Sequence, residues 1–386
     1  MNETRSYILK YQYLVFFAFL ILFSCNEDLC TDKNITPEYF TYSGRIGAVN
    51  NSTILSSDGN VVICGNSDST NIIFKISQEG TLIWRNEFET GNNGLTVGIA
   101  EANTHDLFIC GAYSRNHTSI KNEILLVKTN PVGDTLWTKS FEKDVSTRGD
   151  RIIFTSDQNI LVAGITEDPD SSDNYDLVLI KFNQEGIVIW THDYPSKAYQ
   201  SVYSLIETQD GNYIITGTRT LYGEPSTLLL LKLDENGNEI WDKDSGIQNK
   251  HGYSTIEIPS GDLITCGESI GPNGVGVRVL LLKTDSGGHT LWEKEFDDPQ
   301  FVEVCQVLSL NSDGSYLLGG YARKASEQEK PLILRADSNG KVVACEVFGN
   351  SLGASRCHNI ISMDNKTNII TGWYGEDIFM ANINVN

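Results

Sequence analysis

The chain has 386 residues, of which 40% are hydrophobic, and its formal net charge at pH 7 is −21. A chain of this length and hydrophobic content can bury a large core. Lysine and arginine do not cluster along it, so it lacks the basic face with which proteins neutralise phosphate groups. These properties argue against nucleic acid as a partner, and the acidic surface mainly favours solubility.

The first 24 residues have the pattern of a secretory signal peptide. Arg5 and Lys10 precede a dense apolar run over residues 14–23, and Ser24 follows that run. The run is shorter than the roughly 20 apolar residues that a membrane-spanning helix needs. Cys25 comes next, and the segment LFSC that it ends resembles a bacterial lipobox, whose cysteine is acylated and becomes the mature N-terminus.

Cys25 therefore has two interpretations: a lipid anchor, or an incidental cysteine beside an ordinary signal-peptide cleavage site. The acidic residues at 27 and 28 resemble the export tag of surface lipoproteins from Bacteroidota. The lipoprotein interpretation predicts a signal peptide over residues 1–24, palmitate on Cys25 and a tether over residues 25–37. It also implies export, anchoring to the outer membrane and display at the cell surface.

A unit of about 50 residues then occurs seven times. Each copy contains a short apolar run that ends in glycine and, in six copies, a second apolar run that ends in lysine or arginine. The closing glycines are Gly65, Gly111, Gly164, Gly217, Gly267, Gly320 and Gly372. Repeats of this length indicate stacked supersecondary units.

Residues 202–245 show the unit most clearly. They predict strands at residues 202–206, 213–216, 227–233 and 239–243. Tight turns separate the first pair and the last pair, because Gly211 and Gly237 supply the positive φ that such hairpins need. Four antiparallel strands in about 50 residues predict one blade of a β-propeller, so the fold class is all-β.

The seventh copy is incomplete. It offers strands near residues 368–372 and 377–383, and no fourth strand follows. An unassigned strand-like segment at residues 39–42 precedes the first copy. The sequence therefore predicts a seven-bladed β-propeller over residues 38–386, with the N-terminal strand completing the last blade and removing exposed strand edges.

A tryptophan recurs four residues after the turn glycine of five copies, at positions 84, 137, 190, 241 and 292. This regular placement predicts packing between blades in preference to ligand stacking. The combined pattern resembles the β-propeller repeat of bacterial secreted and surface proteins, and the segments ending at Trp241 and Trp292 look like a quinoprotein-type repeat. Outer-membrane assembly lipoproteins share that repeat without a cofactor, so the resemblance implies the fold and no cofactor.

Three residues of the sixth and seventh copies are weak candidates for chemistry. Cys305 and Cys357 stand at matching places on first strands, which line the channel of a propeller, and His358 follows Cys357. The two thiols could be packing residues, a disulfide, or two ligands of a metal site that has His358 as its third ligand. The sequence contains neither His-Glu-x-x-His nor Gly-x-Ser-x-Gly, and no catalytic constellation is recognisable.

Loops of variable length between the second and third strands predict a ligand-binding face, because loops on a rigid scaffold carry most binding residues. The candidates there are Trp373, Tyr374, Tyr321 and Tyr222, although Trp373 could equally pack within the irregular last blade. Our leading hypothesis is a surface-anchored, non-enzymatic binding or scaffold protein for an unknown protein or glycan. The alternative is a glycan-directed hydrolase or lyase, which would need two carboxylates about 5–9 Å apart in a cleft.

Overall fold

A computed structural model describes residues 31–32, 40–42, 52–67, 70–88, 95–114, 121–168, 171–271, 276–298, 301–324, 327–348, 355–363, 367–374 and 377–384. These residues form β-strands and turns, and none of them belongs to a helix that could span a membrane. The expected signal peptide and the expected lipid anchor at Cys25 lie outside the described residues.

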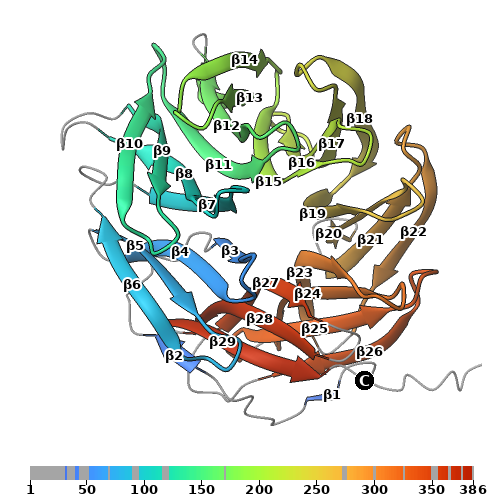
Figure 1. The fold of residues 1–386 in the computed structure, drawn as a ribbon. Coiled ribbons are helices and arrows are strands. Elements are labelled where there is room, and N and C mark those ends of the chain that lie inside the picture. The colour runs from blue at the N-terminus through green and yellow to red at the C-terminus, as the bar shows by residue number, and fades with distance from the viewer. Residues whose placement is uncertain are drawn as a thin grey trace, which may run out of the picture.

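The described strands form seven antiparallel blades arranged in a ring (Figure 1). Blade 1 contains β3 (Ser52–Leu55), β4 (Val61–Ser67), β5 (Thr70–Ile76) and β6 (Leu82–Phe88). Blade 2 contains β7 (Leu95–Glu101), β8 (Leu107–Tyr113), β9 (Glu123–Thr129) and β10 (Thr135–Phe141). Blade 3 contains β11 (Thr147–Phe154), β12 (Ile160–Asp168), β13 (Ser171–Phe182) and β14 (Val188–Tyr194).

Blade 4 contains β15 (Tyr199–Glu207), β16 (Tyr213–Thr220), β17 (Thr227–Leu233) and β18 (Glu239–Gln248). Blade 5 contains β19 (Lys250–Glu257), β20 (Leu263–Ile270), β21 (Val277–Thr284) and β22 (Thr290–Phe296). Blade 6 contains β23 (Val302–Leu310), β24 (Tyr316–Arg323), β25 (Lys330–Ala336) and β26 (Val342–Val347). Blade 7 contains β27 (Ser355–Ser362), β28 (Thr367–Tyr374) and β29 (Asp377–Asn384). The chain is an all-β, seven-bladed propeller, as the repeat predicts.

The ring is closed by the N-terminal strand β2 (Phe40–Tyr42). It pairs antiparallel with β29, and Phe40 lies opposite Met380. The predicted closure is therefore confirmed, and blade 7 gains its fourth strand from the other end of the chain. A second N-terminal strand was not expected: β1 (Thr31–Asp32) lies in the segment assigned to the tether and pairs in parallel with β26 as a fifth strand of blade 6.

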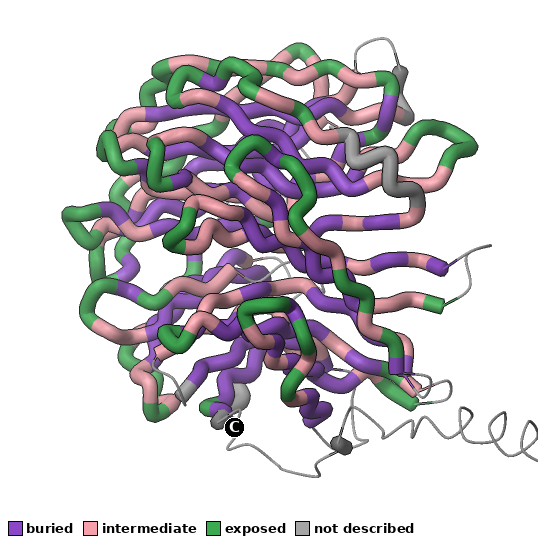
Figure 2. The backbone as a smooth tube through the Cα atoms, turned by 90° about the vertical axis from the view of Figure 1, so that its right-hand side faces the viewer, coloured by how far each residue is buried: buried purple, intermediate pink, exposed green. Residues whose placement is uncertain are grey.

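The core lies between blades. Seven clusters of buried apolar side chains occur among the described residues, and each joins two consecutive blades, including blade 7 with blade 1. The innermost strands contact one another around the ring, and β27 contacts β3. Seen from the side, the buried segments run through the middle of the strands, and many of the exposed ones lie at the turns (Figure 2).

The repeated tryptophans pack between blades, as predicted. Trp84 lies against the turn glycine of the next blade, where a Cβ on Gly133 would lie 2.5 Å from the indole ring. The other four tryptophans occupy the matching place against Gly186, Gly237, Gly288 and Gly340. These glycines have positive φ angles, so each serves both the turn and the contact with the preceding blade.

In blades 1 to 6, the basic residue near the end of the third strand pairs with the aspartate of the hairpin turn in the same blade. Lys232 Nζ lies 2.8 Å from Asp210, and the pairs in the other copies are 2.6 to 3.0 Å apart. Arg335 takes the place of lysine in blade 6. The repeated basic residue is thus explained by a structural ion pair at the tight-turn face, the side of the ring that carries the hairpins between first and second strands.

Candidate functional site

Six of the seven innermost strands contain a β-bulge at the same place. One residue of each strand is skipped in the pairing with the second strand. The skipped residues are Val97, Asp150, Tyr203, Tyr253, Gln306 and His358. A bulge re-aims side chains, and each of these bulges directs one or more residues toward the axis of the ring. In blade 1, the described part of the strand begins at Ser52, just after the matching position.

The repeated glycine makes room for the bulge. A Cβ on Gly217 would lie 1.8 Å from the carbonyl oxygen of Ser201, which is two residues before the bulged Tyr203. The same clash, at 1.7 to 1.9 Å, would occur at Gly111, Gly164, Gly267, Gly320 and Gly372. The feature that identifies the repeat in the sequence is therefore the feature that lets each blade turn a side chain into the channel.

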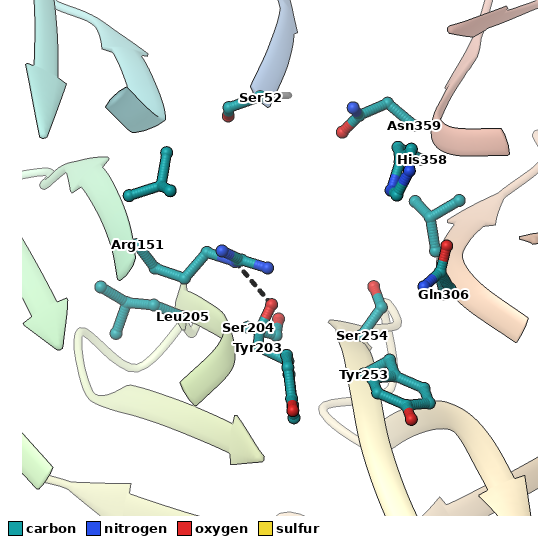
Figure 3. Close-up of a pocket in the computed structure, with 12 residues that line it drawn as sticks. Ser52, Arg151, Tyr203, Ser204, Leu205, Tyr253, Ser254, Gln306, His358 and Asn359 are labelled. Atoms are coloured by element: carbon teal, nitrogen blue, oxygen red, sulfur yellow. Dashed lines mark hydrogen bonds between the residues drawn. The ribbon is translucent and has the colours of Figure 1, made fainter. Parts of the chain in front are cut away.

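Five of the bulged residues, together with residues that flank the bulges, line a cavity of about 240 Å³ on the axis of the ring (Figure 3). All seven blades contribute to it. The lining consists of Ser52, Val97, Arg151, Tyr203, Ser204, Leu205, Tyr253, Ser254, Gln306, Val307, His358 and Asn359. We call this cavity the channel pocket.

Arg151 is the one formally charged side chain among the residues that line the channel pocket, and none of these residues is a carboxylate. Its Nε donates a hydrogen bond of 2.6 Å to the carbonyl oxygen of Tyr203, and its Nη1 donates one of 2.6 Å to the carbonyl oxygen of Asp150. Burial lowers the pKa of Arg151. The neighbouring Asp150 carboxylate pairs instead with Arg148, at 3.0 Å.

Two neutral side chains of the channel pocket have buried polar atoms without a hydrogen-bond partner among the described residues. These atoms are Nε2 of His358 and Oε1 of Gln306. Burial, with a contribution from the positive charges of Arg356 and Arg151, lowers the pKa of His358 to about 4. The imidazole is therefore neutral at pH 7 and lies in a positive electrostatic environment.

A second group of side chains lies toward the variable-loop face, the side of the ring that carries the connections between second and third strands. The Arg356 guanidinium lies 4.2 Å from the ring centre of Tyr321 and 5.6 Å from that of Trp373, within cation–π range of both rings. Glu329 accepts two hydrogen bonds from the same guanidinium, at 2.5 and 2.8 Å. We call these four residues the Arg356 cluster.

Tyr203 and Tyr253 line the channel pocket and pack edge to face, with ring centres 5.0 Å apart. The Tyr253 hydroxyl donates a hydrogen bond of 2.9 Å to Glu268. Burial, followed by the negative charge of Glu268, raises the pKa of Tyr253, and Tyr321 contributes to the same shift. Tyr253 of the channel pocket thus lies within electrostatic range of Tyr321 and Arg356 in the Arg356 cluster.

The structure brings together two of the four aromatic residues proposed from the sequence. Tyr321 and Trp373 belong to blades 6 and 7 and meet through Arg356. Tyr222 is fully exposed on the loop between β16 and β17, three blades from Trp373. The side chain of Tyr374 lies outside the described residues.

The weak metal candidates do not form a site in the part of the chain that the structure describes. Cys305 and Cys357 are buried free thiols, so the disulfide alternative is wrong for this pair. Each thiol instead donates to a carbonyl just beyond the bulge, at 3.4 Å. No group of three metal-binding side chains occurs among the described residues, and His358 faces the channel pocket (Figure 3).

Sequence reasoning did not find the channel pocket, although a signal for it exists. Each bulged residue stands 14 positions before the closing glycine of its copy, as Tyr203 does before Gly217. Reading that position and the next one across all copies would have identified Arg151 and His358. The spacing becomes informative only once the glycine is recognised as the partner of a bulge.

No family model matches the sequence, and no curated protein matches it. Among solved structures, the chain is similar to the Hadza microbial sialidase Hz136, with 11% identity, a TM-score of 0.50 and coverage of 84% of this chain and 76% of the other. It also matches a protein of unknown function from Bacteroides caccae, with 12% identity, a TM-score of 0.45 and coverage of 81% and 94%. At this identity, the likeness to the sialidase concerns the propeller fold alone.

Proposed function

We propose that this chain is a surface-anchored binding protein without enzymatic activity, which takes its ligand at the variable-loop face around the mouth of the channel. The observation that carries the proposal is the electrostatic proximity of the Arg356 cluster to Tyr253 and His358 of the channel pocket. Two half-buried aromatic rings and a guanidinium group, from blades 6 and 7, lie beside a polar cavity to which all seven blades contribute. A concave, preformed site with a few convergent polar groups is the usual form of a ligand site.

The charged and aromatic composition of the site suits a polar ligand from outside the cell, such as a glycan or a protein segment. Rings of tyrosine and tryptophan offer flat apolar faces, whereas Arg356 and Glu329 offer oriented hydrogen-bonding groups. Anchoring through a lipidated Cys25 would hold this face near the cell surface. The tether would begin at Cys25 and end where β1 joins blade 6.

A glycan-directed hydrolase remains the second candidate because of one observation. Tyr253 and Glu268 form a hydrogen-bonded phenol–carboxylate pair at the channel pocket, and a nucleophile beside a base is a recurring catalytic arrangement. Two facts place this function second. No carboxylate occurs among the described residues that line the channel pocket, and the raised pKa of Tyr253 keeps the phenol protonated at neutral pH.

The two functions are separated by one experiment. The chain without residues 1–25 is applied to glycan and protein arrays, and every ligand found is then incubated with the protein and examined by mass spectrometry. The binding function predicts a saturable ligand that is recovered intact. Cleaved product that disappears in Tyr253→Phe would instead establish the hydrolase, and an empty array together with no cleavage would refute both.

A further inference from the structure

We propose that the channel pocket holds one small anionic group, a carboxylate, phosphate or sulfate, between Arg151 and His358. The anion would be either the acidic end of the ligand or a separate small ion. In the first case the inference rests on the proposed binding function. Nothing in the sequence pattern or in the fold likeness assigns this site. It follows from the charge, the geometry and the unpartnered atoms of the channel pocket.

The charge of the channel pocket is opposite to that of the protein. The chain carries a formal charge of −21, yet among the described residues that line the pocket only Arg151 is formally charged. Asp150 forms an ion pair with Arg148 at 3.0 Å and also attracts Arg151, so among the described residues one acid faces two arginines and this group carries a net positive charge. An anion at this place would supply the missing counter-charge in a region of low dielectric, where charge-assisted hydrogen bonds are strong.

The Arg151 guanidinium is held in place before any ligand arrives. Its hydrogen bonds to the carbonyl oxygens of Tyr203 and Asp150 fix the plane of the group, and Figure 3 shows it extended toward the centre of the channel. A preorganised donor loses little conformational entropy when it binds an anion. This arrangement differs from that of a surface arginine, whose side chain must be ordered by its partner.

His358 approaches from the opposite side of the channel pocket (Figure 3). Its Nε2 is buried and lacks a partner among the described residues, and a buried polar atom without a partner is costly. An anion would accept a hydrogen bond from Nε2 and would offset the charges of Arg356 and Arg151, which disfavour the imidazolium form. Binding should therefore raise the pKa of His358.

The size of the channel pocket limits the occupant. A cavity of about 240 Å³ has room for several water molecules, which suits one anionic group with a small polar body. The hydroxyl groups of Ser204 and Ser254 line the same space and provide neutral donors. A cation is disfavoured there because Arg151 would repel it.

The test titrates the chain without residues 1–25 with phosphate, sulfate, acetate and glucuronate at constant ionic strength. Calorimetry measures the affinity, and NMR of selectively ¹³C-labelled histidine follows His358. At least one anion should bind with a stoichiometry of one and raise the pKa of His358. Phosphate and sulfate test for a tetrahedral ion, acetate for the bare carboxylate, and glucuronate for the acidic end of a glycan.

Variants distinguish the loss of the Arg151 charge from a general loss of folding. Arg151→Gln should lower the affinity for the anion by about 10- to 100-fold, because it removes a charge-assisted hydrogen bond. Arg151→Lys should retain part of the affinity, and His358→Gln should weaken binding without touching the backbone bonds of Arg151. Arg85→Gln, on the exposed outer strand β6, is the matched control and should bind as the unchanged protein does.

Failure of this inference is distinguishable from failure of the proposed function. If none of the four anions shifts the His358 signals, or if Arg85→Gln loses as much affinity as Arg151→Gln, the anion site is refuted. If an array ligand binds Arg151→Gln and His358→Gln as tightly as the unchanged protein, the binding function stands and the anion does not belong to that ligand. If an anion fills the channel pocket while the arrays stay empty, the anion site stands alone.

Discussion

Replacement of Gly217 by alanine tests the link between the repeat and the site. The added Cβ would lie 1.8 Å from the Ser201 carbonyl oxygen, whereas ordinary contacts begin near 3.4 Å. The carbonyl oxygen would have to move away by about 1.6 Å to restore an ordinary contact distance. That movement breaks the ladder between β15 and β16 beside the bulge, where Val202 pairs with Gly217. We expect a loss of about 3 kcal/mol in the free energy of unfolding, the upper end of the usual cost of overpacking, because the clash is with backbone.

The control for this change lies in the same hairpin. Gly211 has φ of 78°, and nothing lies within 4 Å of the position that its Cβ would take. Gly211→Ala should therefore cost only the left-handed backbone strain, about 1 to 2 kcal/mol. Urea unfolding followed by tryptophan fluorescence measures both variants. Equal midpoints for Gly217→Ala and Gly211→Ala, or a Gly217→Ala protein as stable as the unchanged one, would show that the glycine does not accommodate the bulge.

Three further predictions concern the ends of the chain and the channel pocket. Deleting residues 1–45 should lower the melting temperature more than deleting residues 1–34, because only the longer deletion removes β2 and opens blade 7. Equal melting temperatures would show that the closure by β2 does not stabilise the ring. Labelled palmitate should enter the exported chain but not Cys25→Ala, and equal labelling of the two would refute the lipid anchor. The pKa of His358 is about 4 in the folded protein and 6.5 for the free side chain, so between these pH values the unfolded chain binds a proton that the folded chain does not. The stability of the fold should therefore be full above pH 6.5 and should fall by up to about 3 kcal/mol as the pH drops toward 4. His358→Gln should flatten this part of the stability profile in acid denaturation, and an unchanged acid dependence would contradict the assignment.

The architecture could be predicted from the sequence because each repeated residue has a local physical purpose. Asp210 and Lys232 pair within a blade, Trp190 packs on Gly237 of the next blade, and Gly217 admits the bulge. Such roles recur in five to seven of the blades, so they appear as a period. The predicted third strand at residues 227–233 coincides with β17 for the same reason.

The site could not be predicted in the same way because its residues differ from blade to blade. Arg151 and His358 share a cavity only because two bulges on opposite sides of the ring aim them at one axis. Arg356 was missed because its role depends on two rings from neighbouring blades, Tyr321 and Trp373. The strand β1 was missed because two residues in a tether carry no periodic signal.

The central claim is that the ligand binds at the variable-loop face around the channel. The most direct measurement is the dissociation constant of the array ligand for matched variants on the two faces. Trp373→Ala and Tyr321→Ala should each weaken binding by more than about 1 kcal/mol, as truncation of aromatic contacts often does. Asn236→Ser and Asn339→Ser, in the tight turns of the opposite face, should leave the constant unchanged. Loss of binding in the turn variants with full binding in the aromatic variants would contradict the account.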